Sequence, residues 1–358
     1  MRMVVAGGGT GGHLFPGLAV AEAVAGADAR AVLFIGSAFG IEARVVPQTR
    51  FAFQPIPIRG LRGRGWRGAF ELALQLPSAL VRAWRLLGEF RADVVLGVGG
   101  YASFPVVLAA WLRRVPAVLL EQNAHPGLAN RVLGRLARRV CTTFAAANAY
   151  FPRDRVVVTG NPVRMFAAPP PVPHNGFTLL AFGGSQGARR LNTALVDAAP
   201  HLRAAISDLR VIHQTGAADR DAIAAAYARL GIAAEVVPFI DDMGGAYHRA
   251  DLVLCRAGAT TLAELMALGK PAILVPYPFA ADDHQRANAA VVAEHGAGLM
   301  VLDRECTGER LAAEITALAS DRARLQQMSA AARGLAVPDA AARVAATCRE
   351  VVESGRGI

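Results

Sequence analysis

The sequence predicts an α/β protein with two doubly wound parallel-sheet domains that face each other across a cleft. Its 358 residues are roughly twice the length of a common single domain. Short apolar runs alternate with longer Ala- and Leu-rich stretches from end to end, a pattern typical of parallel strands joined by crossover helices. Each half also carries a glycine-rich strand-to-helix turn, VVAGGGTGGH in the first and LLAFGGSQGA in the second. Such turns lie at the carboxyl edge of a parallel sheet, where open α/β folds bind ligands.

Each half is expected to form one sheet. In the first half, strands are predicted near residues 3–6, 32–35, 53–58, 94–98, 117–120 and 156–158. The segment NPVRMFAAPPPVPHNG follows, and its prolines exclude both a helix and a central strand. We therefore expect a stiff linker between a domain at 1–162 and a second one at 163–338. In the second half, strands are predicted near 178–182, 211–213, 235–239, 252–254, 272–275 and 299–302.

The composition excludes several classes of protein. Hydrophobic residues make up 53% of the chain and charged residues 18%, so a disordered or fibrous chain is excluded. No run of 18 apolar residues occurs, which predicts no membrane span. The start of the chain runs directly into a strand and a glycine turn, so we expect no export signal. The four cysteines are scattered, which fits a reducing compartment and no structural zinc.

The charge is unevenly divided between the halves. The net charge is +10, and residues 1–160 carry +11 while residues 161–358 carry −1. A preference for arginine over lysine, 37 against one, indicates compositional bias, but bias does not explain the asymmetry. The first half is therefore expected to face something anionic: a nucleic acid, a phosphate-bearing substrate or an acidic lipid surface.

The first glycine turn matches a dinucleotide fingerprint only formally. Gly7, Gly9 and Gly12 satisfy G-x-G-x-x-G between a strand and a helix. A nicotinamide or flavin site also needs an acid at the end of the second strand, and here the next acid, Glu42, lies beyond a further turn. Nicotinamide and flavin are therefore disfavoured, and no cofactor is expected.

Both turns suit a phosphate group. Their glycines allow main-chain N–H groups to point at an anion where a helix begins, and Ser185 adds a hydroxyl beside Gly183, Gly184 and Gly187. A tight turn without a ligand is the alternative. His13 follows Gly12, and in the first helical turn the helix dipole disfavours its protonated form. It is a candidate general base, or else a residue that caps or packs at the helix start.

Two polar segments of the second half are further candidates. In CRAGATTLAELMALGKP, Glu264 is expected in the first turn of a helix, where it could accept hydrogen bonds from sugar hydroxyls or simply stabilise the helix start. The loop PYPFAADDHQRANA could hold a sugar or be merely solvated. A metal bound by Asp282, Asp283 and His284 is disfavoured because no matching ligands occur elsewhere.

Eight motifs in order resemble one family over nearly the whole chain. They are GGGTGGHLFPGLAVAE, GVGGYASFP, EQNAHPGLANR, GNPVR, GGSQGARRLN, HQTG, RAGATTLAE and PAILVPYPFAADDHQRANA. Together they resemble the MurG family of bacterial glycosyltransferases, which transfer N-acetylglucosamine from UDP-N-acetylglucosamine to undecaprenyl-pyrophosphoryl-MurNAc-pentapeptide (lipid I) and form lipid II for peptidoglycan. The resemblance implies a GT-B fold of two Rossmann-like domains, with a C-terminal helix near 339–358 that returns to the first domain.

The resemblance also implies site residues. It places His13 and Tyr101 at the acceptor, and it places Ser185 at the donor diphosphate, the Ile240 backbone at uracil and Glu264 on the ribose. Asn123 and Gln285 would contact the transferred sugar, and Arg286 lies beside Gln285 in the sequence. Arg164 would contact the donor. The full substrate-binding set is Thr10, Gly11, Gly12, Asn123, Arg164, Ser185, Ile240, Ala259, Thr260, Thr261, Leu262, Ala263, Glu264 and Gln285.

Some positions depart from the family pattern. Leu120 stands where histidine often precedes EQN, Cys255 stands where serine is common before RAG, and Arg286 replaces a neutral residue. None of these changes removes a proposed catalytic group.

The implied chemistry needs a stabilised diphosphate and a base. Main-chain N–H groups and a helix dipole would stabilise the leaving UDP in place of a metal. The acceptor C4 hydroxyl would attack from the opposite face with inversion, and His13 is the preferred base, with a carboxylate as the alternative.

A lipid acceptor implies contact with a membrane surface on the cytoplasmic face of the inner membrane. The Arg-rich loop 59–67 carries four arginines and Trp66, and a helix over 70–87 follows. Leu76, Leu80 and Trp84 recur at four-residue steps, so they predict an anchor for anionic lipid or, alternatively, a core-facing stripe.

Two alternatives remain besides this reading. One is another GT-B nucleotide-sugar enzyme, either a glycolipid glycosyltransferase or a UDP-sugar 2-epimerase, against which EQNAHPGLANR and GNPVR argue. The other is a basic nucleic-acid-binding protein. An aromatic content of 6%, not interleaved with the basic residues, disfavours nucleic acid as a partner.

Overall fold

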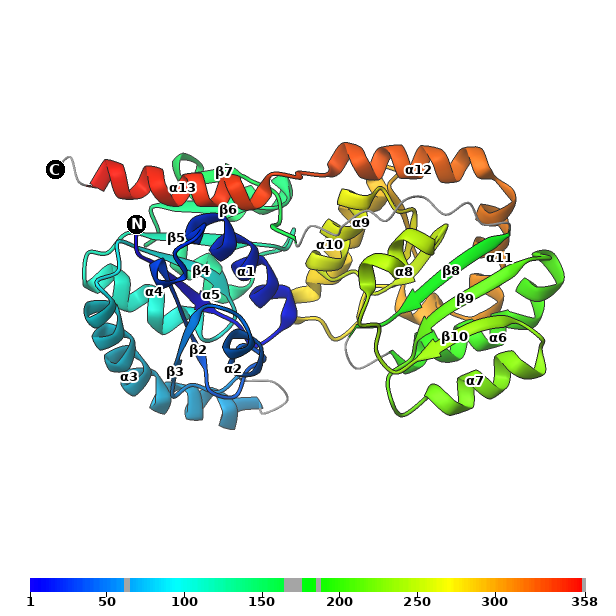
Figure 1. Ribbon diagram of the computed structural model, residues 1–358, viewed down its shortest axis with the longest axis horizontal. Helices are drawn as coiled ribbons and strands as arrows, with labels where there is room; N and C mark the ends of the chain where they lie inside the picture. The colour runs from blue at the N-terminus through cyan, green and yellow to red at the C-terminus, as the bar shows by residue number, and fades with distance from the viewer. Residues whose placement is uncertain (61–64, 164–175, 185–187, 356–358) are drawn as a thin grey trace. The chain divides into compact units, whose positions relative to one another are not determined.

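The computed structural model describes residues 1–60, 65–163, 176–184 and 188–355, without the side chains of residues 65–70, 72 and 73. The chain divides into two compact units. The first unit is Met1–Arg164 with Val337–Ile358, and the second is Met165–Ala336. Each contains one parallel sheet flanked by helices (Figure 1). Several predicted features lie outside the described residues: the linker prolines, Arg164, Ser185, Gly187, and Arg62 and Arg64 of loop 59–67.

The first unit has a seven-stranded sheet with the order β3-β2-β1-β4-β5-β6-β7. All neighbouring strands run parallel, and β1 lies between β2 and β4. The strands are β1 (Met3–Gly7), β2 (Val32–Ser37), β3 (Ala52–Ile56), β4 (Val94–Gly99), β5 (Ala117–Glu121), β6 (Arg139–Thr142) and β7 (Val156–Val158). The helices are α1 (Gly11–Ala25), α2 (Glu42–Val45), α3 (Gly65–Phe90), α4 (Ser103–Leu112), α5 (Leu128–Leu133) and α13 (Ala340–Gly355), with short 3₁₀ segments η1 (Ala29–Ala31), η2 (Val46–Gln48), η3 (Ala145–Tyr150) and η4 (Arg153–Arg155).

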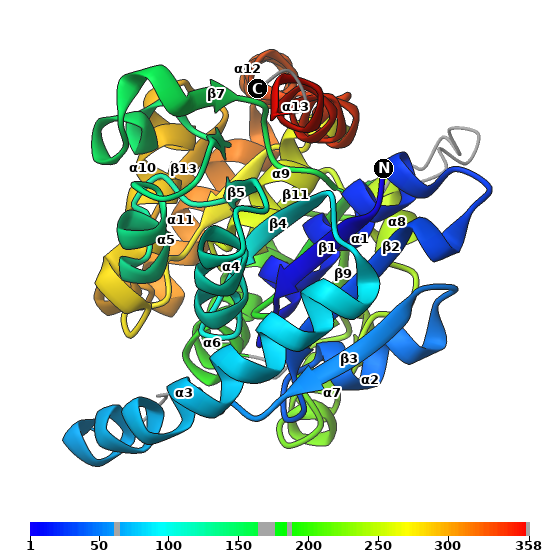
Figure 2. The ribbon, with the colours of Figure 1, turned by 90° about the vertical axis from the view of Figure 1, so that its left-hand side faces the viewer.

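Helices cover both faces of this sheet, so its central strands are apolar on both sides. Val4 and Ala6 of β1 pack in one core with α3 and α4, while Met3 and Val5 pack in the other core with α1 and α13. This two-residue alternation follows from the strand pleat. Figure 2 shows α3 and α4 in front of the sheet of the first unit.

The second unit has a six-stranded parallel sheet with the order β10-β9-β8-β11-β12-β13. Its strands are β8 (Phe177–Phe182), β9 (Leu209–Gln214), β10 (Ala233–Val237), β11 (Leu252–Cys255), β12 (Ala272–Leu274) and β13 (Gly298–Met300). Its helices are α6 (Arg189–Ala205), α7 (Arg220–Arg229), α8 (Met243–Arg249), α9 (Ala259–Leu268), α10 (His284–Glu294), α11 (Gly308–Ser320) and α12 (Arg322–Leu335), with η5 (Ala281–Asp283) and η6 (Asp303–Glu305).

The predicted fold class is confirmed. Two parallel sheets with flanking helices are present, and α13 packs on the first unit, where Val344 and Cys348 are fully buried in the core shared with α1. One strand escaped prediction: β6 has four residues and begins with Arg139, so it shows no apolar run. Its partners β5 and β7 on either side stabilise it as a strand.

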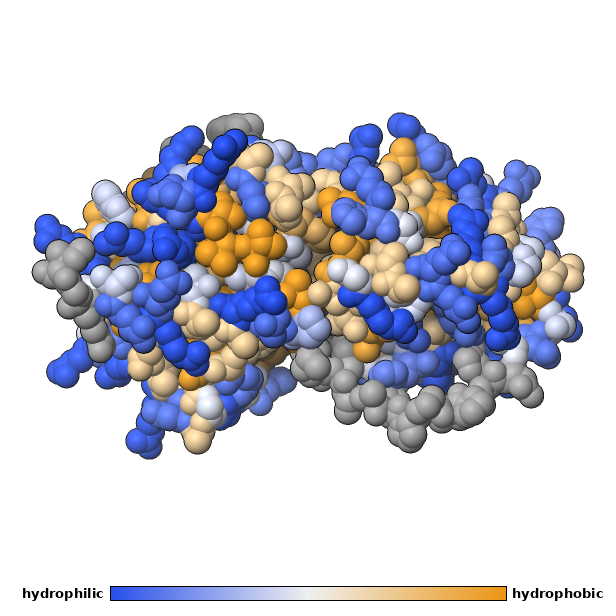
Figure 3. Space-filling model, turned by 90° about the horizontal axis from the view of Figure 1, so that it is seen from above, coloured by the Kyte–Doolittle hydropathy of each residue, from blue (hydrophilic) through white to orange (hydrophobic). Residues whose placement is uncertain are grey.

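On the visible surface of each unit polar side chains predominate, with smaller apolar areas between them (Figure 3). Among the described residues, no helix is both long enough and apolar enough to cross a bilayer.

Candidate active site

The first glycine turn connects β1 to α1 with backbone that only glycine adopts readily. Gly7, Gly8 and Gly9 have φ values of 135°, 140° and 85°. A Cβ on Gly7 would lie 2.3 Å from the Gly99 carbonyl oxygen, so the strand end has no room for a side chain. The turn is thus set closely against the end of β4, at the carboxyl edge of the sheet.

His13 lies in the first turn of α1, as expected. Thr10 is the N-cap residue, and its Oγ1 lies 3.0 Å from His13 Nδ1. The half-buried ring packs against Gly99, where an added Cβ would come 3.1 Å from Nε2. Gly11 and Gly12 open the helix beside it. The Thr10 hydroxyl and Gly99 therefore hold one edge of the imidazole each.

Tyr101 lies beside the same turn. A Cβ on Gly9 would meet Tyr101 Cε1 at 3.0 Å, and one on Gly60 would meet it at 2.6 Å. Both glycines thus make room for the phenol ring. The structure brings Tyr101 to the glycine turn that precedes His13.

A carboxylate of the chain itself occupies this turn. Glu42, in α2, is only 1% exposed. Its Oε2 accepts the Gly9 N–H at 2.7 Å, and its Oε1 accepts the Ser37 N–H at 2.9 Å. Glu42 therefore already binds the Gly9 N–H, one of the main-chain donors that the sequence assigns to a substrate phosphate.

A second buried carboxylate ends β5. Glu121 Oε1 accepts the main-chain and side-chain N–H groups of Asn123, at 2.9 and 3.1 Å, and Oε2 accepts Asn130 Nδ2 at 2.9 Å. Desolvation in this 2% exposed position raises the pKa of Glu121, although these hydrogen bonds oppose the shift. Glu121 thus fixes the orientation of Asn123, one of the predicted sugar contacts.

In the second unit, a neutral amide joins two parts of the predicted donor site. Gln214, at the end of β9, donates from Nε2 to the Gly184 carbonyl at 2.7 Å. Its Oε1 accepts the Ile240 N–H at 3.0 Å. The main-chain N–H of Ile240 is thus bound within the protein. The Ile240 carbonyl is therefore the main-chain group to consider for a contact with the uracil.

Glu264 is buried in α9, with its Oε2 accepting the Tyr247 hydroxyl at 2.9 Å. The expectation that it lies in the first helical turn is wrong, because α9 begins at Ala259 and Glu264 is its sixth residue. Thr260 and Thr261 therefore already belong to this helix. The side chains of Ala259, Leu262 and Ala263 are buried, so ligand contacts at these positions would come from the main chain.

The loop after β12 is held by two side chains. Gln285 Oε1 accepts the Tyr277 N–H at 2.9 Å. Arg256 donates to the Val275 and Pro276 carbonyls and pairs with Asp303 at 2.7 Å, with both side chains largely buried. The ring of Tyr277 lies beneath the Arg256 guanidinium. Gln285 and Arg256 therefore shape this loop from its two sides.

The polar residues of that loop pair with protein groups. His284 Nδ1 lies 2.7 Å from the Ala281 carbonyl oxygen, and Arg286 lies 3.5 Å from Asp283. In the part of the chain that the structure describes, no group of three or more His, Cys, Asp or Glu residues is arranged to hold a metal ion.

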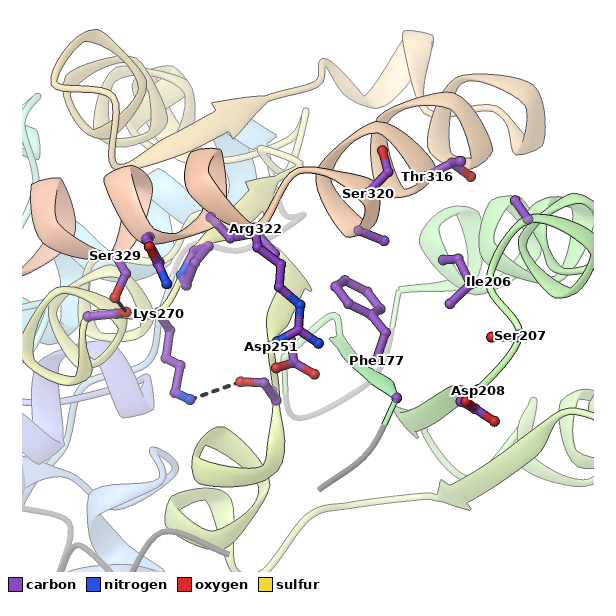
Figure 4. A pocket seen from close by; sticks show the side chains of 18 of the residues that line it. Phe177, Ile206, Ser207, Asp208, Asp251, Lys270, Thr316, Ser320, Arg322 and Ser329 are labelled. Atoms are coloured by element: carbon purple, nitrogen blue, oxygen red, sulfur yellow. Dashed lines mark hydrogen bonds between the residues drawn. The ribbon is translucent and has the colours of Figure 1, made fainter. Parts of the chain in front are cut away.

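A cavity of about 590 Å³ in the second unit lies away from these groups. It opens where β8, β11 and β12 begin, and Figure 4 shows Lys270, Asp251 and Arg322 in its wall. Lys270 Nζ donates to the Ala250 carbonyl at 2.9 Å, and Asp251 accepts the Thr178 N–H. This cavity is at the amino edge of the sheet, opposite to the edge at which glycine turns bind phosphates, and we assign it no part in the site.

Sequence reasoning missed four residues that hold the site: Glu42, Glu121, Gln214 and Tyr247. Glu121 and Gln214 lie in the motifs EQN and HQTG, and a polar residue at the end of a buried strand was the available signal. Glu42 and Tyr247 had no local signal, because their partners are 33 and 17 residues away.

Comparisons with known proteins agree over both units. Residues 3–142 match the glycosyltransferase family 28 N-terminal domain, and residues 178–344 match the C-terminal domain of the same family. A protein of Syntrophotalea carbinolica is 49% identical over 357 residues, covering 98% of this chain and 99% of its own length. A protein of Anaeromyxobacter sp. (strain K) is 47% identical, with 98% and 93% covered. Both are named UDP-N-acetylglucosamine–N-acetylmuramyl-(pentapeptide) pyrophosphoryl-undecaprenol N-acetylglucosamine transferase.

A solved structure is also similar over its full length. The crystal structure of Acinetobacter baumannii MurG has a TM-score of 0.80 and 34% identity, and the match covers 97% of this chain and 99% of that one.

Proposed function

The chain belongs to the MurG family within glycosyltransferase family 28, and from this premise we propose how its residues carry out the transfer of N-acetylglucosamine from UDP-N-acetylglucosamine to lipid I. The product is lipid II, the precursor of peptidoglycan. The similarity to named transferases over nearly all of the chain is the observation that carries this activity.

The second unit is proposed to bind the donor. Ser185 and the glycine turn would bind the diphosphate. The Ile240 carbonyl would contact the uracil, and the Glu264 carboxylate would contact the ribose. Two observations support this assignment. Gln214 fixes the main chain at both Gly184 and Ile240, and the Tyr247 hydroxyl orients the Glu264 carboxylate through Oε2. Gln285 would contact the transferred sugar, and Arg164 would contact the donor.

The first unit is proposed to supply the base. The C4 hydroxyl oxygen of the acceptor attacks the anomeric carbon, the bond from that carbon to UDP breaks, and the hydroxyl proton passes to His13 Nε2. The Thr10 hydroxyl lies 3.0 Å from His13 Nδ1. We propose the neutral tautomer in which Nδ1 carries the proton and donates it to this hydroxyl, so that Nε2 is the basic nitrogen. Tyr101 and Asn123 would position the acceptor and the transferred sugar. The β linkage results because attack is opposite to the leaving group.

The test is an incubation with labelled UDP-N-acetylglucosamine and a lipid I analogue, with and without a chelator. We expect label in the lipid product in both cases, and no product without the acceptor. Epimerised or hydrolysed donor with no lipid product would reject the transferase. Filter binding to nucleic acid at physiological salt should give no retention, and strong retention would favour the nucleic-acid alternative.

We also propose that the outer surface of α3 and α4 binds an anionic membrane surface. Exposed apolar side chains on α3 and at the end of α4 form this surface, which we call the apolar patch: Leu74, Val81, Trp84, Trp111 and Leu112. The Arg113 guanidinium stacks on the Trp84 ring with 4.8 Å to the centroid. Tryptophan and leucine beside arginine suit a headgroup interface.

This patch differs from the predicted stripe. Leu80 packs against the core and Leu76 is half-buried, so only Trp84 of the three expected residues is well exposed. The reason is helical geometry, since steps of four residues advance about 40° beyond a full turn. Of loop 59–67, Arg59 is described, and its guanidinium lies over the exposed Phe39 ring, 3.9 Å from its centroid. The side chains of Trp66 and Arg67 are not among those that the structure describes.

A further inference from the structure

Glu42 is buried in a position built for a carboxylate. Its side chain is 1% exposed and lies between β1 and β2, with one oxygen on the Gly9 N–H and the other on the Ser37 N–H. Both distances, 2.7 and 2.9 Å, are those of charge-assisted hydrogen bonds. A buried carboxylate is tolerated only when such donors compensate for its lost hydration.

Three glycines make the space for this carboxylate. A Cβ on Gly8, Gly36 or Gly40 would come within 2.6 Å of Glu42 side-chain atoms. Gly8 also has φ +140°, a conformation that other residues rarely adopt. Gly8 comes from the turn after β1, and Gly36 and Gly40 come from the end of β2 and the turn that follows it.

The turn that Glu42 holds leads directly to the proposed base. Gly9, which donates to Glu42, precedes Thr10, and the Thr10 hydroxyl contacts His13 Nδ1. The Tyr101 ring packs on the same Gly9. A shift of the Gly9 peptide would therefore move the partners of both His13 and Tyr101.

We propose that Glu42 is a positioning residue that takes the place of a bound anion in the first glycine turn and thereby orients His13 for proton transfer. It follows that the Gly9 and Ser37 N–H groups bind no substrate phosphate. The proposal rests on the proposed function for His13, whereas the occupation of the turn by Glu42 does not.

The test is a double-mutant cycle between Glu42→Ala and His13→Ala. Because misplacement of a catalytic group costs up to about 10² in rate, we expect Glu42→Ala to lower kcat about 10- to 100-fold. The Kd for UDP should stay within about twofold, since the donor binds the second unit. In the His13→Ala background the same change should cost less than about threefold, because a residue that acts through His13 has nothing left to orient.

Two further variants keep the cycle interpretable. Glu42→Gln has the same shape and keeps one acceptor, so a smaller, again non-additive loss is expected, and it replaces Glu42→Ala if that variant unfolds. Glu22→Ala is the matched control, since it removes an exposed carboxylate of α1 that pairs with Arg50, and its kcat should be unchanged. The positioning role would be overturned if Glu42→Ala lowered kcat by the same factor in the wild type and in His13→Ala. A loss of UDP binding in Glu42→Ala would overturn it as well.

A second readout does not need activity. Formate or acetate should raise the melting temperature of Glu42→Ala more than that of the wild type, because only the variant has lost the carboxylate of the first turn. The same anions should restore part of the kcat of Glu42→Ala and none of that of His13→Ala. Absence of any anion effect on the variant's stability would reject the turn as an anion site. If the wild type itself forms no lipid product, the proposed function fails, and the stability readout still decides the role of Glu42 in the turn.

Discussion

The two glycine turns look alike in sequence but have different surroundings. In the first unit the Gly9 N–H is bound by a buried carboxylate, Glu42, whereas in the second unit the Gly184 carbonyl is bound by a neutral amide, Gln214. A substrate diphosphate would meet a negative charge at the first turn and no such charge at the amide of the second. This difference shows that the glycines make space for an anion in each turn. Side chains distant in sequence decide whether that anion is a carboxylate of the protein or a phosphate of the substrate.

The strongest way to test this contrast is to remove His13. If the first turn serves proton transfer and the second serves donor binding, His13→Ala should lower kcat by about 10² or more and leave the Kd for UDP unchanged. Steady-state kinetics and calorimetric titration with UDP measure the two effects. His201→Ala, which changes an exposed histidine of α6, is the control and should match the wild type. Turnover near the wild-type rate in His13→Ala would reject its role as base.

A second prediction concerns pH and the polar network beneath the second turn. His213 is buried between the Tyr227 hydroxyl and Asn192 Oδ1, and burial lowers the pKa of His213 to about 4. In the unfolded chain the pKa is about 6.5, so between these values the unfolded state binds the extra proton and stability falls as pH falls. The contribution is fully present above about pH 6.5 and is lost toward pH 4.

The expected loss between pH 7 and pH 5 is about 2 kcal/mol of unfolding free energy. Urea unfolding at both pH values measures it for the wild type and for His213→Gln, in which this part of the pH dependence should vanish. His201→Gln should keep the wild-type dependence. An unchanged pH dependence in His213→Gln would contradict the assignment.

The ribose contact offers a third, smaller effect. Tyr247→Phe removes the hydroxyl bound to Glu264 Oε2 and should weaken UDP about tenfold, because a hydrogen bond to a buried carboxylate is lost. Binding of 2′,3′-dideoxy-UDP should not change, since it lacks the hydroxyls that Glu264 is proposed to accept. Tyr227→Phe removes another buried hydroxyl of the same unit and serves as the control. Equal weakening of both nucleotides would place Glu264 away from the ribose.

The smallest effect is expected at the apolar patch. Arg113→Gln removes the cation over Trp84 and should weaken binding to anionic vesicles about fivefold at low salt, with little change for neutral vesicles. Vesicle sedimentation at low and high salt measures this. Val158→Ser, which removes an exposed apolar side chain from β7, should bind as the wild type does. Salt-independent binding, equal for both lipids, would remove the electrostatic part of the proposal.

Much of the fold could be predicted because its signals are local. The strands β1, β4 and β8 are apolar runs, interrupted in β8 only by Thr178, and glycines follow each of them, the pattern of parallel strands buried on both faces. The short strand β6 lacked that signal, and no local signal marked the start of α9 at Ala259, five residues before Glu264. In both cases packing against neighbours outweighed weak local preference.

The sequence by itself determined two parallel-sheet units, a glycine turn at the start of each, and a histidine in the first turn of a helix. Only the tertiary structure decided which side chains contact Gly9 in the first turn and Gly184 in the second. Glu42 reaches Gly9 across 33 residues, and Gln214 joins Gly184 to Ile240 across 30 and 26 residues. The physical reason is that a hydrogen bond requires its atoms within about 3 Å. Strand register and helix packing set such distances, and neither can be read from the residues next to a glycine.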